Sequence, residues 1–142
     1  MLCVNKYPQD YVDECRARVK RQLAAYRGLM AATSQTKDPK VTAAVESFES
    51  VFFNNMVLVL DSYFCHRSRT IEGKDGNPLN EVRVLCNSML ENKGRFRTEK
   101  AITLKLEKSV LKLKVGDPIA LSEADFALLS TAFFDEIARK FV

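Results

Sequence analysis

The chain contains 142 residues, of which 46% are hydrophobic and 28% are charged, with only 5 glycines and 4 prolines. This composition excludes a disordered or collagen-like chain and fits one folded domain over residues 1–142. The net charge of +4 is weaker than the clustered basic charge of a dedicated nucleic-acid-binding domain.

The cysteines and the single histidine bear on metals, redox state and location. They are Cys3, Cys15, Cys65, Cys86 and His66. This spacing is not typical of a zinc site, and we expect neither a metal nor a cofactor. We expect the thiols to be reduced, as in a cytoplasmic protein. The N-terminus does not resemble a signal peptide, and the longest apolar run, residues 56–60, is far too short to span a membrane.

Two long amphipathic helices are predicted in the first half of the chain. The first opens at Tyr7-Pro8 and carries an apolar stripe with a spacing of three and four residues, namely Tyr11, Cys15, Val19, Leu23, Tyr26 and Met30. The second runs from about Val41 to Thr70, with a stripe of Val41, Val45, Phe48, Phe52, Met56, Val59 and Tyr63. Because residues 51–65 are so apolar, we expect this helix to lie centrally in a bundle.

Two further helices are predicted in the second half. Asn77 as N-cap and Pro78 at the first position begin a helix that reaches about Glu91. Ser122 begins the last helix, with a stripe of Phe126, Leu129, Phe133, Ile137 and Phe141. Between them, residues 101–121 alternate apolar residues with lysines, which favours short strands, although the same residues also fit a helix. The predicted fold is mainly α, a four-helix-bundle-like single domain with a small β hairpin or meander before the last helix.

The densest polar region runs from Asp61 to Arg83. On a helical wheel, polar residues at the start of this region share one sector of about 140° with two earlier asparagines. The residues of this sector are Asn54, Asn55, Asp61, Ser62, Cys65, His66 and Arg69. As a functional site, this sector would form a polar pocket on the central helix. The alternative is an ordinary half-exposed helix whose charges form weak surface pairs.

This region predicts two possible chemistries. As a binding site, it would hold a small carboxylate or phosphate on arginine forks and on the start of the third helix, using Arg67, Arg69, Asn77, Asn80 and Arg83. As an enzyme of hydrolase or transferase type, it would use His66 with Asp61 and Ser62, because histidine exchanges protons near neutral pH.

Two other features indicate partners. Residues 93–115 carry 8 basic and 2 acidic residues, which suits contact with nucleic acid. Phe96 is the only aromatic residue there for stacking on bases, which argues against that role. Phe133 and Phe134 are adjacent and cannot point the same way on a helix, so one of them is expected at a homodimer interface.

The stretch from His66 to Arg83, of pattern HRxRxxEGKDGNPLNEVR, resembles one in a group of small uncharacterised bacterial proteins. The stretch from Val115 through Phe141 is similar to the end of the same group, and the likeness covers most of the chain from about residue 48. It implies a bacterial cytosolic origin and no particular activity.

These observations favour a non-enzymatic binding or protein-interaction module that self-associates, with a possible anionic ligand near the turn between the second and third helices. The small enzyme using His66 is the alternative, and weak nucleic-acid binding through residues 93–115 is the third hypothesis.

Overall fold

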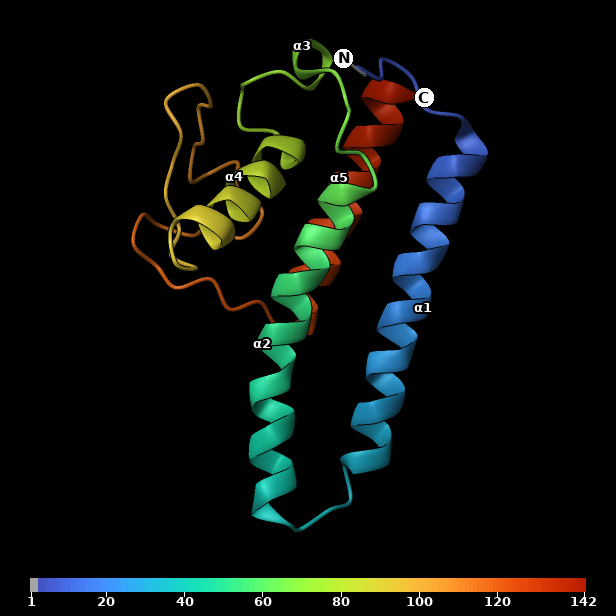
Figure 1. The fold of residues 1–142 in the computed structure, drawn as a ribbon, viewed down its shortest axis with the longest axis vertical. Helices are drawn as coiled ribbons and strands as arrows, with labels where there is room; N and C mark the ends of the chain where they lie inside the picture. The colour runs from blue at the N-terminus through green and yellow to red at the C-terminus, as the bar shows by residue number, and fades with distance from the viewer. Residues whose placement is uncertain (1–2) are drawn as a thin grey trace.

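The computed structural model describes residues 3–142 and is mainly helical, as predicted. Its helices are α1 (Gln9–Thr33), α2 (Pro39–Ser62), α3 (Arg69–Glu72), α4 (Pro78–Glu91) and α5 (Glu123–Phe141). The long helices α1, α2 and α5 run side by side, and the shorter α4 packs against α2 and α5 (Figure 1). The core lies where α2, α4 and α5 meet.

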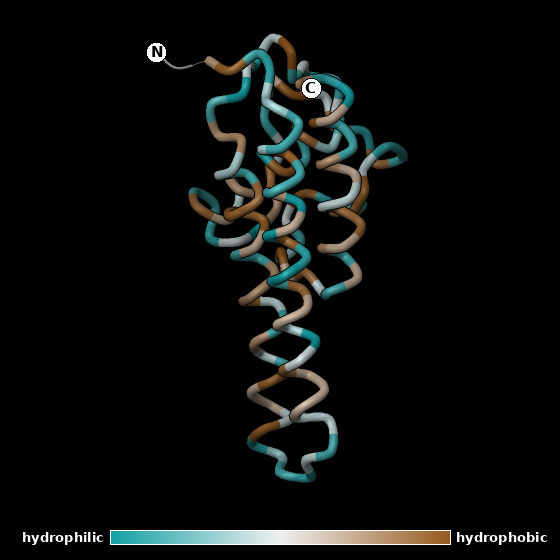
Figure 2. Tube along the Cα trace, turned by 90° about the vertical axis from the view of Figure 1, so that its right-hand side faces the viewer, coloured by the Kyte–Doolittle hydropathy of each residue, from teal (hydrophilic) through white to brown (hydrophobic). Residues whose placement is uncertain are grey.

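The last turns of α1 and the first turns of α2 project beyond the rest of the molecule (Figures 1 and 2). We call this projection, residues 26–50, the arm. Asp38 caps α2 by accepting from the Lys40 N–H, and Pro39 occupies the first turn. At its base, the buried Tyr26 donates to Glu49 and stacks on Phe52. The pKa of Tyr26 is raised to about 12, mainly by burial and to a smaller extent by the hydrogen bond to Glu49.

The prediction of one continuous helix from Val41 to Thr70 is wrong. α2 ends at Ser62, and a turn separates it from the short α3. The N-terminal segment supplies the reason, because the Val4 N–H donates to the His66 carbonyl and the Ser68 N–H donates to the Val4 carbonyl, each at 2.8 Å. These pairings use backbone groups that a continuing helix would need for its own ladder.

The predicted apolar stripe of α2 is also misplaced. The buried side chains are Phe53, Met56, Val57 and Leu60. Of the predicted stripe only Met56 is buried. Val41, Val45 and Phe48 lie on the arm, beyond the body that would cover them, and Phe52, Val59 and Tyr63 are half-buried. The stripe predicted for α1 is largely correct, except that Val12 is buried where Tyr11 was expected.

The predicted β hairpin or meander is not present in residues 3–142, where residues 101–121 form an irregular loop. The buried carboxylate of Glu81 accepts the N–H groups of Val110 and Leu111, at 2.8 and 3.0 Å, and the Ser109 hydroxyl at 3.0 Å. A carboxylate on α4 therefore takes the donors that a strand ladder would have used. The nearest approach to pairing is an isolated bridge between Arg95 and Pro118.

The caps of α4 and α5 are as predicted. Asn77 accepts from the N–H groups of Leu79 and Asn80, and Ser122 forms a capping box with Asp125. Both adjacent phenylalanines of α5 are buried within the chain itself, with the Arg16 guanidinium 4.9 Å from the Phe134 ring centre. Neither ring is therefore free for the dimer interface that the sequence suggested for one of them.

Candidate functional site

A buried ion cluster lies at the centre of the polar region predicted as a site. Glu72, only 1% exposed, ends the short helix α3 and accepts from two arginines. Arg67 Nε lies 2.6 Å from its Oε1. Arg83 binds it with both ends of the guanidinium fork, at 2.6 Å to Oε1 and 3.0 Å to Oε2. Asn80 Nδ2 donates to Oε2 at 2.8 Å, so both carboxylate oxygens are fully engaged.

Local sequence signals place these groups. Ser68 caps α3 and Asn77 caps α4, so both helices begin beside the cluster. The connecting turn needs Gly73, with a φ of 82°, and Gly76, with a φ of 87°, because ordinary residues rarely adopt such angles. From α5, Lys140 Nζ donates to the Glu72 carbonyl at 2.7 Å, which ties the C-terminal helix to the same turn.

The Arg67 guanidinium is bonded on every side. Besides Glu72, it donates to Asp61 Oδ1 at 2.8 Å, to the Phe64 carbonyl at 3.1 Å and to the Leu79 carbonyl at 3.2 Å. Burial alone would raise the pKa of Glu72, but Arg83, Arg67 and Asn80 outweigh burial and hold this pKa below its ordinary value. The cluster is therefore an internal cross-link between the end of α2, α3 and α4.

The structure brings together four of the five residues predicted to bind an anion. Arg67, Asn77, Asn80 and Arg83 surround Glu72, whereas Arg69 is exposed on α3. The carboxylate that the arginine forks bind is supplied by the chain itself. An external anion would have to displace Glu72, so ligand binding by these residues stays a prediction.

The residues of the alternative enzyme do not form a reactive group of side chains. Asp61 pairs with Arg67. The Ser62 hydroxyl donates to the Val59 carbonyl at 2.6 Å. His66 is exposed in the turn after α2. An acid–base pair needs side chains within hydrogen-bond reach of each other, and the structure gives these three no shared contact.

The four thiols fall into two classes. Cys3 and Cys65 are exposed, and Cys15 and Cys86 are buried. Burial raises the pKa of Cys15 and raises that of Cys86 to about 12, which disfavours the reactive thiolate. We expect Ellman's reagent to modify two thiols of the native chain quickly and the other two only after denaturation. Rapid modification of all four would contradict this burial.

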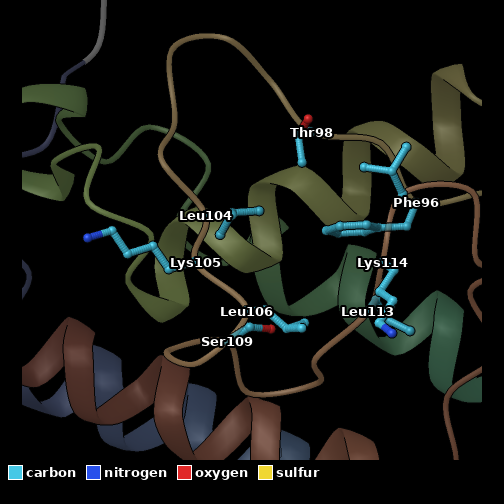
Figure 3. A pocket seen from close by; sticks show the side chains of 9 residues that line it. Phe96, Thr98, Leu104, Lys105, Leu106, Ser109, Leu113 and Lys114 are labelled. Atoms are coloured by element: carbon cyan, nitrogen blue, oxygen red, sulfur yellow. The ribbon is translucent and has the colours of Figure 1, made fainter.

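The basic stretch forms a loop around a small hollow of about 250 Å³. In Figure 3 the Phe96 ring points toward Leu104, and the amino group of Lys105 points away from the hollow. Ser109, which also lines it, already donates to Glu81. Among residues 3–142, the lysines of this stretch form no ion pairs. The hollow thus offers an apolar lining with a solvated lysine rim, and nucleic-acid binding here stays a prediction.

An uncovered apolar surface lies on α2. In the part of the chain that the structure describes, α2 is the one helix long and apolar enough to cross a membrane, yet only 22% of its most apolar window is buried. Val51 is 68% exposed and Phe48 is 38% exposed. Two hollows lie along this surface, one of about 400 Å³ that Leu29 and Val45 help to line, and one of about 550 Å³ that reaches Met89 of α4. We call this surface the α2 face.

Comparisons with known proteins give no match to a family model, to a curated protein or to a solved structure. The resemblance to a group of small bacterial proteins therefore stays a prediction, and functional inference starts from the geometry described above.

Sequence reasoning missed two features. It located the polar region but not Glu72 as its centre, because nothing local marks a glutamate as buried. It also assigned the apolar residues of α2 to a single core-facing stripe, whereas the structure shows a buried side and a second apolar side that is uncovered.

Proposed function

We propose that this protein is a non-enzymatic interaction module that forms a homodimer through the α2 face. The observation that carries the proposal is that the most apolar helix of the fold is also poorly covered. Soluble monomers rarely leave a large contiguous apolar patch in water, and such patches mark interaction sites. The absence of a shared contact among His66, Asp61 and Ser62 favours this function over the enzyme.

A second copy of the chain is the partner that the charges favour. Residues 51–60 of α2 contain no charged side chain, so this half of the face does not select a partner of opposite charge. A two-fold axis brings the same patch on two subunits together, and an uncharged apolar face is complementary to itself. Burying it removes from water the surface that the bundle leaves uncovered.

Substitution of Val51 by aspartate tests this function. Light scattering coupled to size exclusion should give the wild type twice the 16.1 kDa of one chain and should give Val51→Asp the mass of one chain, because a charge buried in an apolar interface is costly. Leu128, 62% exposed on α5, offers the matched control, and Leu128→Asp should remain a dimer.

A wild type that is monomeric at all accessible concentrations would contradict the proposal. If that monomer instead floated with uncharged phosphatidylcholine vesicles, and Val51→Asp did not, the α2 face would be a membrane-binding surface. If Val51→Asp and the wild type both had the mass of a dimer, the interface would lie elsewhere on the molecule.

A further inference from the structure

The residues on the uncovered side of α2 follow the spacing of a coiled-coil seam. Val41, Ala44, Phe48, Val51, Asn55 and Leu58 are separated alternately by three and four residues. This is the spacing of the a and d positions of a heptad, with residues 41, 48 and 55 at a and residues 44, 51 and 58 at d. We call these six residues the α2 seam.

Most of the α2 seam lies apart from the side chains that hold the fold together, although Leu58 packs against the core and Phe48 stacks on Tyr26 and Phe52. The buried residues of α2, beginning with Phe53, lie on the opposite side of the helix, since residues 48 and 53 are about 140° apart on the helical wheel. No member of the seam is buried, and Ala44, Phe48, Val51 and Asn55 are exposed. A helix with two apolar sides needs packing partners on both sides. Among the described residues α1, α4 and α5 pack against α2, yet four seam residues stay exposed.

We propose that α2 pairs in parallel with α2 of a second copy along the seam, and that Asn55 faces its own copy across the two-fold axis. This inference rests on the proposed function, and it specifies how the two subunits are arranged. The seam extends over residues 41–58, about 26 Å of helix. The hollow containing Val41 and Phe48 and the hollow containing Phe48 and Leu58 lie along it and would receive side chains of the partner.

Asn55 decides between the two possible directions. A buried amide without a hydrogen-bond partner is costly. In the parallel arrangement, the two Asn55 amides meet and bond to each other, as a polar a-position residue does when it fixes register and oligomer state. In an antiparallel arrangement centred on the seam, Val41 would face Leu58 and Asn55 would face Ala44, whose methyl group cannot bond the amide. The polar residue therefore favours the parallel pair.

Disulfide cross-linking tests the direction of pairing. The exposed thiols are first removed with Cys3→Ser and Cys65→Ser, since the other two are buried. In this background, oxidation should cross-link Val41→Cys to itself and Leu58→Cys to itself, because parallel pairing places equal positions opposite each other and both variants keep Asn55. Added Val51→Asp should abolish both cross-links, which separates them from random collisions.

A mixture of the two variants provides the opposing result. Antiparallel pairing would cross-link Val41→Cys to Leu58→Cys and neither variant to itself, and this outcome would overturn the parallel pairing while leaving the proposed dimer intact. A dimer that Val51→Asp dissociates but that gives no cross-link at positions 41 or 58 would also overturn the parallel pairing and leave the proposed dimer intact. A monomeric wild type would overturn both proposals.

Replacement of the amide provides a readout of its role. Asn55→Leu should keep the dimer or make it tighter and should add species of higher mass, because an apolar a position no longer restricts the oligomer state. Thr42, exposed on α2 at a b position away from the seam, offers the matched control, and Thr42→Leu should leave the distribution of masses unchanged. Weaker association of Asn55→Leu, with no new species, would overturn the role assigned to Asn55.

Discussion

Glu72→Ala should destabilise the fold by about 3–5 kcal/mol, the range found when one member of a buried ion pair is removed. The reason is that Arg67 and Arg83, which are 3% and 9% exposed, would keep their charges without the carboxylate that both of them bind. That loss is a large fraction of the 5–15 kcal/mol that stabilises a typical domain. Urea denaturation followed by circular dichroism measures it.

Two variants separate the charge of Glu72 from its surroundings. Glu72→Gln keeps the shape of the side chain and part of its hydrogen bonding, so it should lower the free energy of unfolding less than Glu72→Ala does. Glu14 also contacts two arginines, Arg18 and Arg21, but on the exposed surface of α1. Glu14→Ala should leave stability nearly unchanged, because exposed ion pairs contribute little. Equal effects of Glu72→Ala and Glu14→Ala would refute the structural role of the buried cluster.

The same carboxylate predicts a dependence of stability on pH. The pKa of Glu72 in the folded state lies below its ordinary value of 4.5, so the folded protein binds fewer protons than the unfolded chain. Its contribution is fully present above pH 4.5 and is lost as the pH falls through the lower folded-state value. The free energy of unfolding of the wild type should therefore fall more steeply below pH 4.5 than that of Glu72→Gln.

The features that could be predicted from the sequence are those set by neighbouring residues. Helix α4 has the predicted bounds, because Asn77 and Pro78 form its cap and first turn without help from distant parts of the chain. The end of α2 was mispredicted because Val4, more than 60 residues earlier, binds the backbone of His66 and Ser68. The predicted strands fail for the same kind of reason, since Glu81 on α4 binds the N–H groups of Val110 and Leu111.

The candidate site divides in the same way. The sequence located the polar region from its composition, but Arg67 and Arg83 face inward, toward a glutamate that sequence alone did not distinguish from its exposed neighbours. The α2 face could have been predicted from the sequence, because the spacing of the seam over residues 41–58 can be counted directly. It was not predicted because all apolar residues of this helix were assigned to a single stripe that faces the core.

The second large effect concerns Gly76, at the contact between the turn before α4 and the irregular loop. A Cβ atom at this position would lie 2.4 Å from the Thr103 carbonyl oxygen. This oxygen belongs to the backbone, so it cannot rotate out of the way as a side chain can. Thr103 is also held in place because its N–H donates to the Lys74 carbonyl at 2.9 Å. The φ of 87° adds strain for any residue with a Cβ.

Gly76→Ala should therefore cost about 1–2 kcal/mol for the backbone angle and a further 1–3 kcal/mol for the overpacked contact. Gly116→Ala separates the two contributions, because Gly116 has a similar φ of 90° but nothing within 4 Å of its added Cβ. It should show only the first cost in urea denaturation. If Gly76→Ala were no more destabilising than Gly116→Ala, the loop would not be fixed against the turn.

A second measurement follows the loop itself. If the added methyl group displaces the loop, amide hydrogen exchange in Gly76→Ala should become faster at Thr103, Val110 and Leu111, because the hydrogen bonds of these amides hold the loop on the turn and on Glu81.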